Sequence, residues 1–573
     1  MSDTRTPPSP SEDQLPARLR AERARAARDL GIELTTNHYR RPAERRFVAA
    51  DRHRTTILFG GLTDKHEQLI KAALQGLGHD GEPLPCPDVS SFQTGKEYGN
   101  PGQCNPNYFT VGNLVKHLQE LQEAGTPREE LLDRFVLVTG GACGPCRFGM
   151  YEAEYRLALR NAGFDGFRVV LFDKDAGLDQ TGEGTGIDFD VDFFLALLYG
   201  IVVGDLLNDV GYQIRPFEVE PGRTDAELAE CVARLGEVFA RGGTSPSSVR
   251  AGLRRVARRG TRSRHGLAIA EEVLGHRFVD ALADVRDRLA TVQVDRTRPR
   301  PVVKITGEFW AQTTEGDGNF RMFEFLEREG AQVIVEPVAT WIMYLLHQSK
   351  QRNTDRKGIG PDRAVRRSGD VLGRLADDLR LRRANAPLGV AEAIVRREWE
   401  RHRAALGGLP HPLTDQYELQ RMAHPYYNSR AAGGEGHLEV AKNLYYSTRG
   451  LCHMVLSLKP FGCMPSTQSD AVQSAVTSHY PDMVYLPVET SGEGEVNAHS
   501  RVQMALGDAR AKCTLELEGV LERTGLTLDA VRDYAADHPE LTSAMHHVPH
   551  HEGVAGTAAN FVLHVADRMR SGR

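Results

Sequence analysis

The segment Phe135-Val-Leu-Val-Thr-Gly-Gly-Ala-Cys-Gly-Pro-Cys146 contains a short β-rich run that leads directly into a loop rich in glycine. A helical pattern begins immediately afterwards, near Arg147. A buried strand followed by a loop and a helix is the repeating unit of parallel α/β proteins. This stretch therefore predicts an α/β fold built on a parallel sheet.

The same alternation of short β-rich runs and amphipathic helices extends in both directions from this segment. Further runs begin at Thr55, Phe167, Pro301, Gln332, His453 and Met483. They fall into two groups of similar size, which suggests an internal duplication. We therefore expect two parallel-sheet α/β domains with helical insertions and a helical C-terminal tail.

Composition changes along the chain predict five parts. They are an N-terminal extension at 1–50, a first α/β domain at 51–215, a helical Arg-rich segment at 216–300, a second α/β domain at 301–515 with a helical insertion at about 342–450, and a helical tail at 516–573. The basic run that starts at Arg250 has two interpretations, a patch for polyanions or the solvated face of a helix, and we favour the second.

Charge and hydropathy exclude several classes of protein. The chain has 573 residues, with 71 Lys and Arg against 77 Asp and Glu, so its net charge of -6 predicts no attraction to nucleic acid or to an anionic membrane. The longest apolar run, Phe193 to Val203, is shorter than the roughly 20 residues of a membrane helix. The polar N-terminus does not resemble a secretory signal. We expect a cytoplasmic protein with reduced thiols.

The eight cysteines are too few for a disulfide scaffold and differ in their surroundings. Cys231, Cys452 and Cys513 lie in helical or strand patterns, where cysteine behaves as a small hydrophobic residue. Cys86 lies between prolines and is not assigned. The remaining four lie in loops with glycine or proline that precede helices; they are Cys104, Cys143, Cys146 and Cys463.

Loops at the carboxyl ends of parallel strands share one edge of a sheet, where α/β proteins bind ligands. A helix N-terminus favours a thiolate, the form that binds metal. Three or four such thiolates are more typical of an iron–sulfur cluster than of zinc, whose structural sites usually pair two Cys-x-x-Cys turns. The alternative is a thioredoxin-type dithiol at Cys143-Gly-Pro-Cys146, which leaves Cys104 and Cys463 unexplained.

Five motifs carry a resemblance to a known family. They are Thr94-Gly-Lys-Glu with Cys104-Asn-Pro-Asn-Tyr, Gly144-Pro-Cys-Arg-Phe-Gly-Met-Tyr, Gly307-Glu-Phe-Trp, Glu336-Pro-Val-Ala-Thr-Trp, and Pro460-Phe-Gly-Cys-Met-Pro-Ser. Over most of residues 55 to 515 the sequence resembles the 2-hydroxyacyl-CoA dehydratase components and the activase-associated proteins related to them. The resemblance implies two Rossmann-like domains around a cluster held by Cys104, Cys146 and Cys463. Cys143 would replace or supplement Cys146.

The resemblance also implies a chemistry. A 4Fe-4S cluster, or a double-cubane cluster as in relatives that reduce small molecules, would receive single electrons from an actin-like ATPase activator in trans and pass them to an acyl-CoA through a ketyl radical. The loop at Gly182 lacks the Lys-Ser/Thr ending of a nucleotide-binding loop, so ATP use requires that separate partner. A homodimer, or a heterodimer with a related subunit, is also implied. The non-enzymatic alternative is an electron-transfer partner that carries the cluster.

Several polar residues are candidates for the chemistry around the cluster. Proposed acid or base groups are Glu435, His437 and Glu493, and proposed substrate contacts are Lys96, Glu97 and Arg147. Each has an alternative role as an ordinary turn, cap or surface residue. The segment from His546 to His551 has the composition of a metal site, but Pro549 interrupts any helical spacing.

Overall fold

The structure is a computed structural model that describes residues 22, 25, 26, 29, 47–141, 146–173, 186, 187, 189–241, 275–359, 371–431 and 433–571. Cys143 and the basic run that starts at Arg250 lie outside the described residues. The chain divides into two compact units, Met1–Glu44 and Arg45–Arg573. The second unit contains both sheets and is described below.

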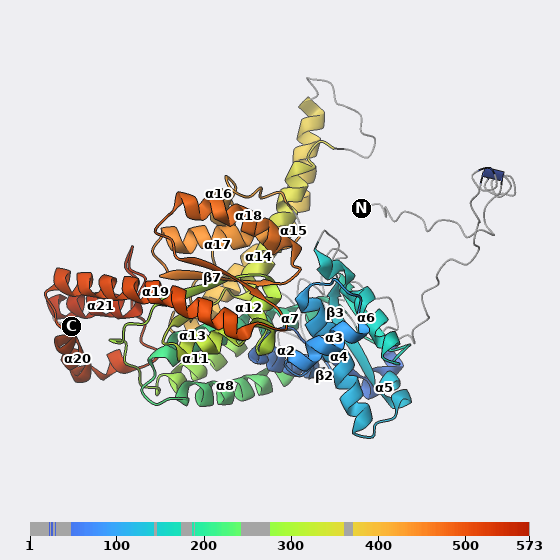
Figure 1. Cartoon of the computed structure of the whole chain (residues 1–573), viewed down its shortest axis with the longest axis horizontal. Coiled ribbons are helices and arrows are strands. Elements are labelled where there is room, and N and C mark those ends of the chain that lie inside the picture. Colours follow the sequence, from blue (N-terminus) through green and yellow to red (C-terminus); the bar gives the residue numbers. More distant parts are fainter. Residues whose placement is uncertain are drawn as a thin grey trace, which may run out of the picture. The chain divides into compact units, whose positions relative to one another are not determined.

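The first sheet has four parallel strands in the order β2-β1-β3-β4 (Figure 1). Its strands are β1 (Thr56–Phe59), β2 (Asp80–Pro83), β3 (Phe135–Gly141) and β4 (Arg168–Asp173). Its connecting helices are α2 (Asp64–Gly76), α3 (Val89–Tyr98), α4 (Asn105–Glu123), α5 (Arg128–Arg134), η3 (Arg147–Met150) and α6 (Tyr151–Asn161).

The second sheet repeats this arrangement, in the order β6-β5-β7-β8 with all strands parallel. Its strands are β5 (Val302–Gly307), β6 (Gln332–Ile334), β7 (Met454–Pro460) and β8 (Tyr485–Thr490). Its connecting helices are α12 (Phe309–Thr313), α13 (Met322–Arg328), α14 (Val338–Asp355), α15 (Val371–Ala405), α16 (Gln416–Ala423), α17 (Gly436–Thr448) and α18 (Met464–His479). The predicted α/β fold with two parallel sheets is confirmed.

Strand β2 was not among the predicted runs. Its sequence, Asp80-Gly-Glu-Pro83, is polar, and Gly81 is its buried residue. β2 lies at the edge of the sheet and pairs with β1 alone. An edge strand needs no continuous apolar run and tolerates proline, so the hydrophobic pattern does not reveal it.

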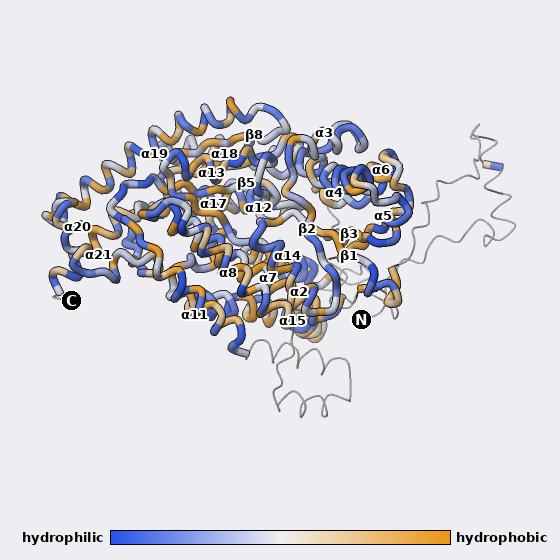
Figure 2. Tube along the Cα trace, turned by 90° about the horizontal axis from the view of Figure 1, so that it is seen from below, coloured by the Kyte–Doolittle hydropathy of each residue, from blue (hydrophilic) through white to orange (hydrophobic). Residues whose placement is uncertain are grey.

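A helical layer packs beside the first sheet around α7 (Val191–Ile214). Its apolar core also includes residues of α2, α8 (Arg223–Ala240) and α11 (Arg277–Leu289). Figure 2 shows long apolar stretches in this region. Among the described residues, α7 is the helix whose length and composition would allow it to cross a membrane, and 67% of its most apolar window is buried inside the protein.

Helix α7 continues to Ile214, well beyond the apolar run at Phe193 to Val203. Its second half contains buried polar residues, which are tolerated because they have hydrogen-bond partners. Asp205 accepts hydrogen bonds from the backbone N–H groups of Val338 and Ala339, at 2.8 and 2.9 Å, and lies 3.2 Å from His66 Nε2. A carboxylate is favoured at a helix N-terminus. Asp205 therefore fixes the start of α14 against α7.

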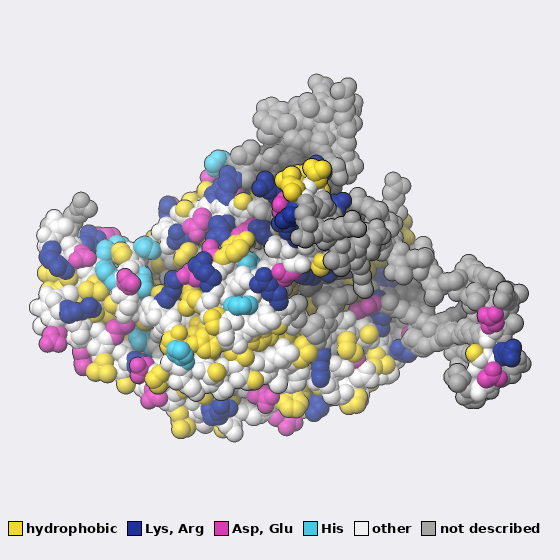
Figure 3. Space-filling view, turned by 90° about the horizontal axis from the view of Figure 1, so that it is seen from above, with side chains coloured by type: hydrophobic (Ala, Val, Ile, Leu, Met, Phe, Trp, Pro, Cys, Tyr) yellow, Lys and Arg dark blue, Asp and Glu magenta, His cyan; other side chains and the backbone are white. Residues whose placement is uncertain are grey.

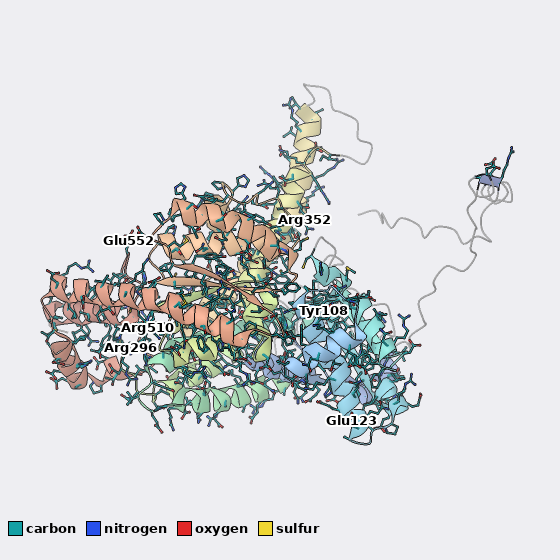
Figure 4. The ribbon with its side chains drawn as sticks, viewed as in Figure 1. Tyr108, Glu123, Arg296, Arg352, Arg510 and Glu552 are labelled. Carbon is teal, nitrogen blue, oxygen red and sulfur yellow. The ribbon has the colours of Figure 1, made fainter. Side chains whose placement is uncertain are left out.

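The C-terminal region consists of α19 (Glu495–Thr524), α20 (Leu528–Asp537) and α21 (Thr557–Ser571). The buried guanidinium of Arg296, labelled in Figure 4, holds the segment before α21 in place. It donates hydrogen bonds to the carbonyl oxygens of Leu541, Ser543, Ala544 and His546. On the face drawn in Figure 3, basic and acidic side chains are interspersed.

Candidate functional site

Three of the four loop cysteines occupy the same structural position. Cys104, Cys146 and Cys463 are the N-cap residues of α4, η3 and α18, and each has an extended backbone. The loops of Cys146 and Cys463 follow the carboxyl ends of β3 and β7, as expected from the sequence. Each cysteine thus stands where a strand or loop turns into a helix.

The Cys104 and Cys463 loops contact each other directly. The backbone N–H of Asn105 donates to the carbonyl oxygen of Phe461 at 3.1 Å, and the Asn105 side chain donates to that of Thr490 at 2.8 Å. Gly462 has a φ of +75°, and a Cβ at this position would lie 3.2 Å from Cys104 Cα. Glycine supplies both the left-handed backbone and the close approach.

Tyr151 and Arg147 link Cys104 to the Cys146 loop. Cys104 Sγ lies 3.2 Å from the hydroxyl oxygen of Tyr151, the first residue of α6. The Arg147 guanidinium donates to the carbonyl oxygen of Gly102, in the loop before Cys104. Burial raises the pKa of the Cys104 thiol, and the positive charge of Arg147 partly opposes that rise.

One carboxyl group, that of Glu308, acts on all three cysteines. Glu308 follows β5 and caps α12 by accepting a hydrogen bond from the Ala311 N–H at 2.9 Å. Burial raises the pKa of Cys104, of Cys146 to about 12, and of Cys463 well above its usual range, and the Glu308 charge raises each further. Glu308 is therefore part of the electrostatic surroundings of each of the three thiols.

The helix N-termini were expected to favour thiolates. Backbone N–H groups at the starts of α4 and η3, those of Asn107 and Phe148, do lower the pKa of Cys104 and Cys146. Burial is the larger influence on each of the three thiols and raises its pKa. Metal binding would favour the thiolate form.

The charge of Glu435, one of the predicted acid or base groups, acts on Glu308. Glu435 Oε1 accepts a hydrogen bond from the Phe309 N–H at 2.6 Å, which places its carboxyl beside the start of α12. Burial raises the pKa of both carboxyl groups, and the Glu435 charge adds to the rise at Glu308. Such a pair retains a proton at a pH where an exposed glutamate has lost it.

A third buried carboxyl, that of Glu439 in α17, forms hydrogen bonds with the start of α18, directly after Cys463. It accepts hydrogen bonds from the hydroxyl groups of Ser466, at 2.8 Å, and Ser469, and its Oε2 lies 3.9 Å from Lys459 Nζ. The Ser466 side chain also lowers the pKa of Cys463, although burial dominates there. This network fixes the first turn of α18, where Cys463 is the cap.

The remaining predicted polar residues have other surroundings. His437 is 4% exposed, and burial lowers its pKa to about 4; it borders a small cavity beside His347. Lys96 and Glu97 are exposed on α3, where Lys96 Nζ lies 5.2 Å from the centre of the Phe92 ring. Glu493 is exposed in the loop after β8. Of the six polar candidates, Glu435 and Arg147 adjoin the cysteine loops.

The donor set bears on what the site could hold. Within the parts of the chain that the structure describes, no three His, Cys, Asp or Glu side chains are close enough together to hold a single metal ion. That holds also for the segment from His546 to His551, where His546 Nε2 lies 3.1 Å from His564 Nε2. A polynuclear cluster is held by several cysteine thiolates rather than by a compact set of ligands around one ion. Cys104, Cys146 and Cys463, on segments that contact one another, are donors of that chemical type.

Sequence reasoning did not identify Glu308, Glu439 or Tyr151 as part of the site. Glu308 was detectable, because it directly follows β5 and the carboxyl ends of parallel strands are where ligands bind. Tyr151 ends one of the five quoted motifs and is the first residue of α6, but no role was assigned to it. Glu439 lies in the first turn of α17 and carries no comparable signal.

Comparison with known proteins identifies no relative. No family model matches the chain, and no curated protein matches it at a significant level. The functional argument therefore depends on the residues of the site.

Proposed function

We propose that the protein binds an iron–sulfur cluster through Cys104, Cys146 and Cys463 and acts as a dehydratase-type or reductase-type component on an acyl-CoA substrate. The observation that supports this proposal is that the loop of Cys104 contacts the loop of Cys463 directly, and contacts the segment that begins at Cys146 through Tyr151 and Arg147. A cluster bound by three thiolates would supply single electrons and one open iron.

In this proposal the buried carboxyl groups handle the proton. Removal of a hydroxyl group as water requires a proton donor at the leaving oxygen. Glu308 and Glu435 have raised pKa values because they are buried close together, so they keep a proton available near neutral pH. Tyr151, whose hydroxyl lies 3.2 Å from Cys104 Sγ, would donate a hydrogen bond to the sulfur once it is a thiolate.

The first experiment tests whether a cluster is present. The full chain is purified without oxygen, its iron and acid-labile sulfide are measured, and the reduced sample is examined by electron paramagnetic resonance. Bound iron and sulfide with a cluster signal support the proposal. A colourless protein without iron, after reconstitution with iron and sulfide, contradicts it.

Three matched cysteine variants test the ligand assignment. Cys104→Ala and Cys463→Ala are expected to lose most of the bound iron, whereas Cys231→Ala, a buried position in α8, is expected to keep it. Equal iron content in all three variants would exclude the assigned ligands. Cys143 can be tested in the same way against Cys146.

A glutamate variant distinguishes a catalytic role from a role in electron transfer alone. Glu435→Gln keeps the shape and the hydrogen bond from the Phe309 N–H but cannot deliver a proton. With a cognate ATPase activator and a panel of CoA esters, we expect this variant to keep its iron and lose turnover about 100-fold or more. A cluster that is reduced without turnover of any ester, in the wild type, would identify the chain as an electron carrier.

The dithiol alternative has a different requirement. An exchange-active Cys-x-x-Cys needs a thiolate near neutral pH. Burial raises the pKa of Cys146 to about 12, and the charges of Glu435 and Glu308 raise it further. A dithiol at Cys143 and Cys146 also leaves Cys104 and Cys463 without a role, although their loops contact each other. We therefore propose the metal-binding function instead.

A further inference from the structure

A cavity of about 370 Å³ lies at the carboxyl edge of the first sheet and does not include the three cysteines. Its walls come from the ends of β1, β2 and β3, from one face of α4, and from α12. The strand order β2-β1-β3-β4 reverses direction between β1 and β3. That switch point is where open α/β sheets bind their ligands, and the volume falls within the range of small-molecule sites.

One wall of the cavity contains a buried donor without a partner. Trp310 is 6% exposed, and among the described residues its indole Nε1 has no hydrogen-bond partner. A buried N–H group that donates to nothing is costly, and such a group often marks an absent ligand.

The indole is oriented with this donor side toward the cavity. A Cβ at Gly61, which lines the cavity, would lie 3.9 Å from Cδ1, the atom next to Nε1. A Cβ at Gly318, which does not line it, would lie 2.3 Å from Cη2 on the far edge of the ring. Phe109 packs against the indole face, with ring centres 5.4 Å apart.

The charges around the cavity are predominantly negative. The lining carboxyl side chains are those of Asp64, Glu67, Glu82 and Glu315, and burial raises the pKa of Glu67 to about 8, so Glu67 is largely protonated at neutral pH. None of the described lining residues is Lys or Arg, and burial lowers the pKa of the lining His117. Glu82 is paired with Lys71 at 2.7 Å outside the cavity wall. Burial, and then the Glu315 charge, raise the pKa of Cys86 to about 12, as expected in a region of negative potential.

We propose that this cavity is a second ligand site, which takes a small organic amine that also carries a hydrogen-bond acceptor. The ammonium group offsets the negative charge of the lining carboxylates Asp64 and Glu315. Glu315 Oε2 also accepts a hydrogen bond from the backbone N–H of Asp64 at 2.8 Å, which holds this carboxylate at the start of α2. The acceptor takes the Trp310 N–H. The described lining has no Lys or Arg to pair with the phosphate groups of a CoA ester. The amine site is therefore separate from the proposed acyl-CoA function and does not depend on it.

The experiment is a calorimetric titration of the full wild-type chain with named probes. The amines are ethanolamine, glycinamide and agmatine; the anions are succinate and acetyl phosphate; the neutral analogue is propionamide. We expect at least one amine to bind with a Kd of about 1 mM or tighter and the anions not to bind. Absence of binding by all three amines at about 10 mM, or equal binding of the anions, overturns the proposal.

Three variants locate the bound amine. Trp310→Phe keeps a ring beside Phe109 but removes the N–H, and Glu315→Gln removes a charge while keeping an acceptor for the Asp64 N–H; each is expected to weaken binding about ten-fold. Thr139→Leu, at the end of β3, is expected to abolish binding by filling the cavity.

The matched control is Thr477→Leu in α18, outside the cavity, which is expected to bind the amine like the wild type. Circular dichroism of each variant verifies that it is folded. If folded Thr139→Leu binds as tightly as the control, the amine lies elsewhere and the assignment is wrong.

Discussion

The two sheets share one strand order, but the side chains at their carboxyl edges have opposite surroundings. The edge of the first sheet borders an open cavity with carboxyl groups and no described Lys or Arg in its lining. The edge of the second sheet is filled by buried charge pairs, such as Lys304 with Glu336 at 2.7 Å and Lys459 with Glu439 at 3.9 Å. Topology thus decides where polar groups collect, and the connecting helices decide whether those groups are paired.

The helices between β6 and β7 explain the difference. α17 is the last of four helices, α14 to α17, between β6 and β7, whereas the corresponding connection of the first sheet, between β2 and β3, consists of α3, α4 and α5. α17 contributes Glu435, Glu439 and Lys442, all buried, to the edge of the second sheet. The helices of the first sheet place no Lys or Arg among the described residues that line the cavity, so the carboxyl groups there face open space.

The largest loss of stability is expected from breaking a buried charge pair at the carboxyl edge of the second sheet. Lys304 is 0% exposed, and Lys304→Met leaves the buried Glu336 carboxylate with Lys442 as its nearest remaining base. Loss of one partner of a buried pair costs about 3 kcal/mol of unfolding free energy. Thermal and denaturant unfolding of the variant measure the change.

Two controls accompany this variant. Lys71→Met breaks a pair of the first edge, Lys71 with Glu82, whose side chains are partly exposed, and should cost less than about 1 kcal/mol. The double variant Lys304→Met/Glu336→Gln should recover part of the stability, because no unpaired carboxylate remains. Equal losses at Lys304 and Lys71 would show that the two edges do not differ as described.

The same contrast explains how much of the fold was predictable. The strands with apolar runs were recognised because both faces of a parallel sheet are covered and demand continuous hydrophobic residues. β2 was missed because it is a polar edge strand. The apolar run at Phe193 to Val203 does not reveal the second half of α7, because Asp205 there is buried with specific partners. Hydropathy does not register a polar residue whose partners lie far away in the sequence.

The site was predictable to a similar degree. The cysteine loops were identified because they contain glycine or proline and precede helices, and those of Cys146 and Cys463 also follow strands. Glu439 becomes part of the site only after the helices between β6 and β7 bring α17 against α18. The cavity depends on Gly61 and on Trp310 in α12, and the Thr313 hydroxyl of the same helix donates a hydrogen bond to the Gly61 carbonyl oxygen at 3.1 Å, across 252 positions. No local pattern encodes such a contact.

A leucine introduced at each edge tests the difference in packing, with a smaller expected effect. Ser457 in β7 is fully buried, so Ser457→Leu has no space for the added carbons and should cost about 1–3 kcal/mol of unfolding free energy. Thr139 at the end of β3 borders the cavity, so Thr139→Leu should change stability by less than about 0.5 kcal/mol. Similar losses at both positions in urea unfolding would mean that the first edge is as tightly packed as the second.

The smallest expected effect is on the pH dependence of stability. The pKa of a buried glutamate is raised at the edge of the first sheet and lowered at the edge of the second. Burial raises the pKa of Glu67, beside the first-edge cavity, to about 8, and the charges of Glu315 and Asp64 add to the rise. Burial also opposes the ionisation of Glu336, yet the charges of Lys304 and Lys442 lower its pKa to about 2. The folded chain therefore binds a proton at Glu67, and releases one at Glu336, more readily than the unfolded chain does.

The sign of each contribution follows from this linkage. Glu67 stabilises the fold fully below its unfolded pKa of 4.5, and the contribution is lost as the pH rises to about 8. Glu336 contributes to stability above pH 4.5, and its contribution is lost as the pH falls to about 2.

Glutamine does not titrate, so replacing either glutamate removes its contribution to the pH dependence. Between about pH 5 and pH 8, the Tm of Glu67→Gln should therefore fall by about 2 °C less than the Tm of the wild type. Glu336→Gln should be less stable than the wild type near neutral pH, with a deficit that narrows below about pH 4. Parallel Tm curves for wild type and Glu67→Gln would place that carboxyl in water rather than at a desolvated sheet edge.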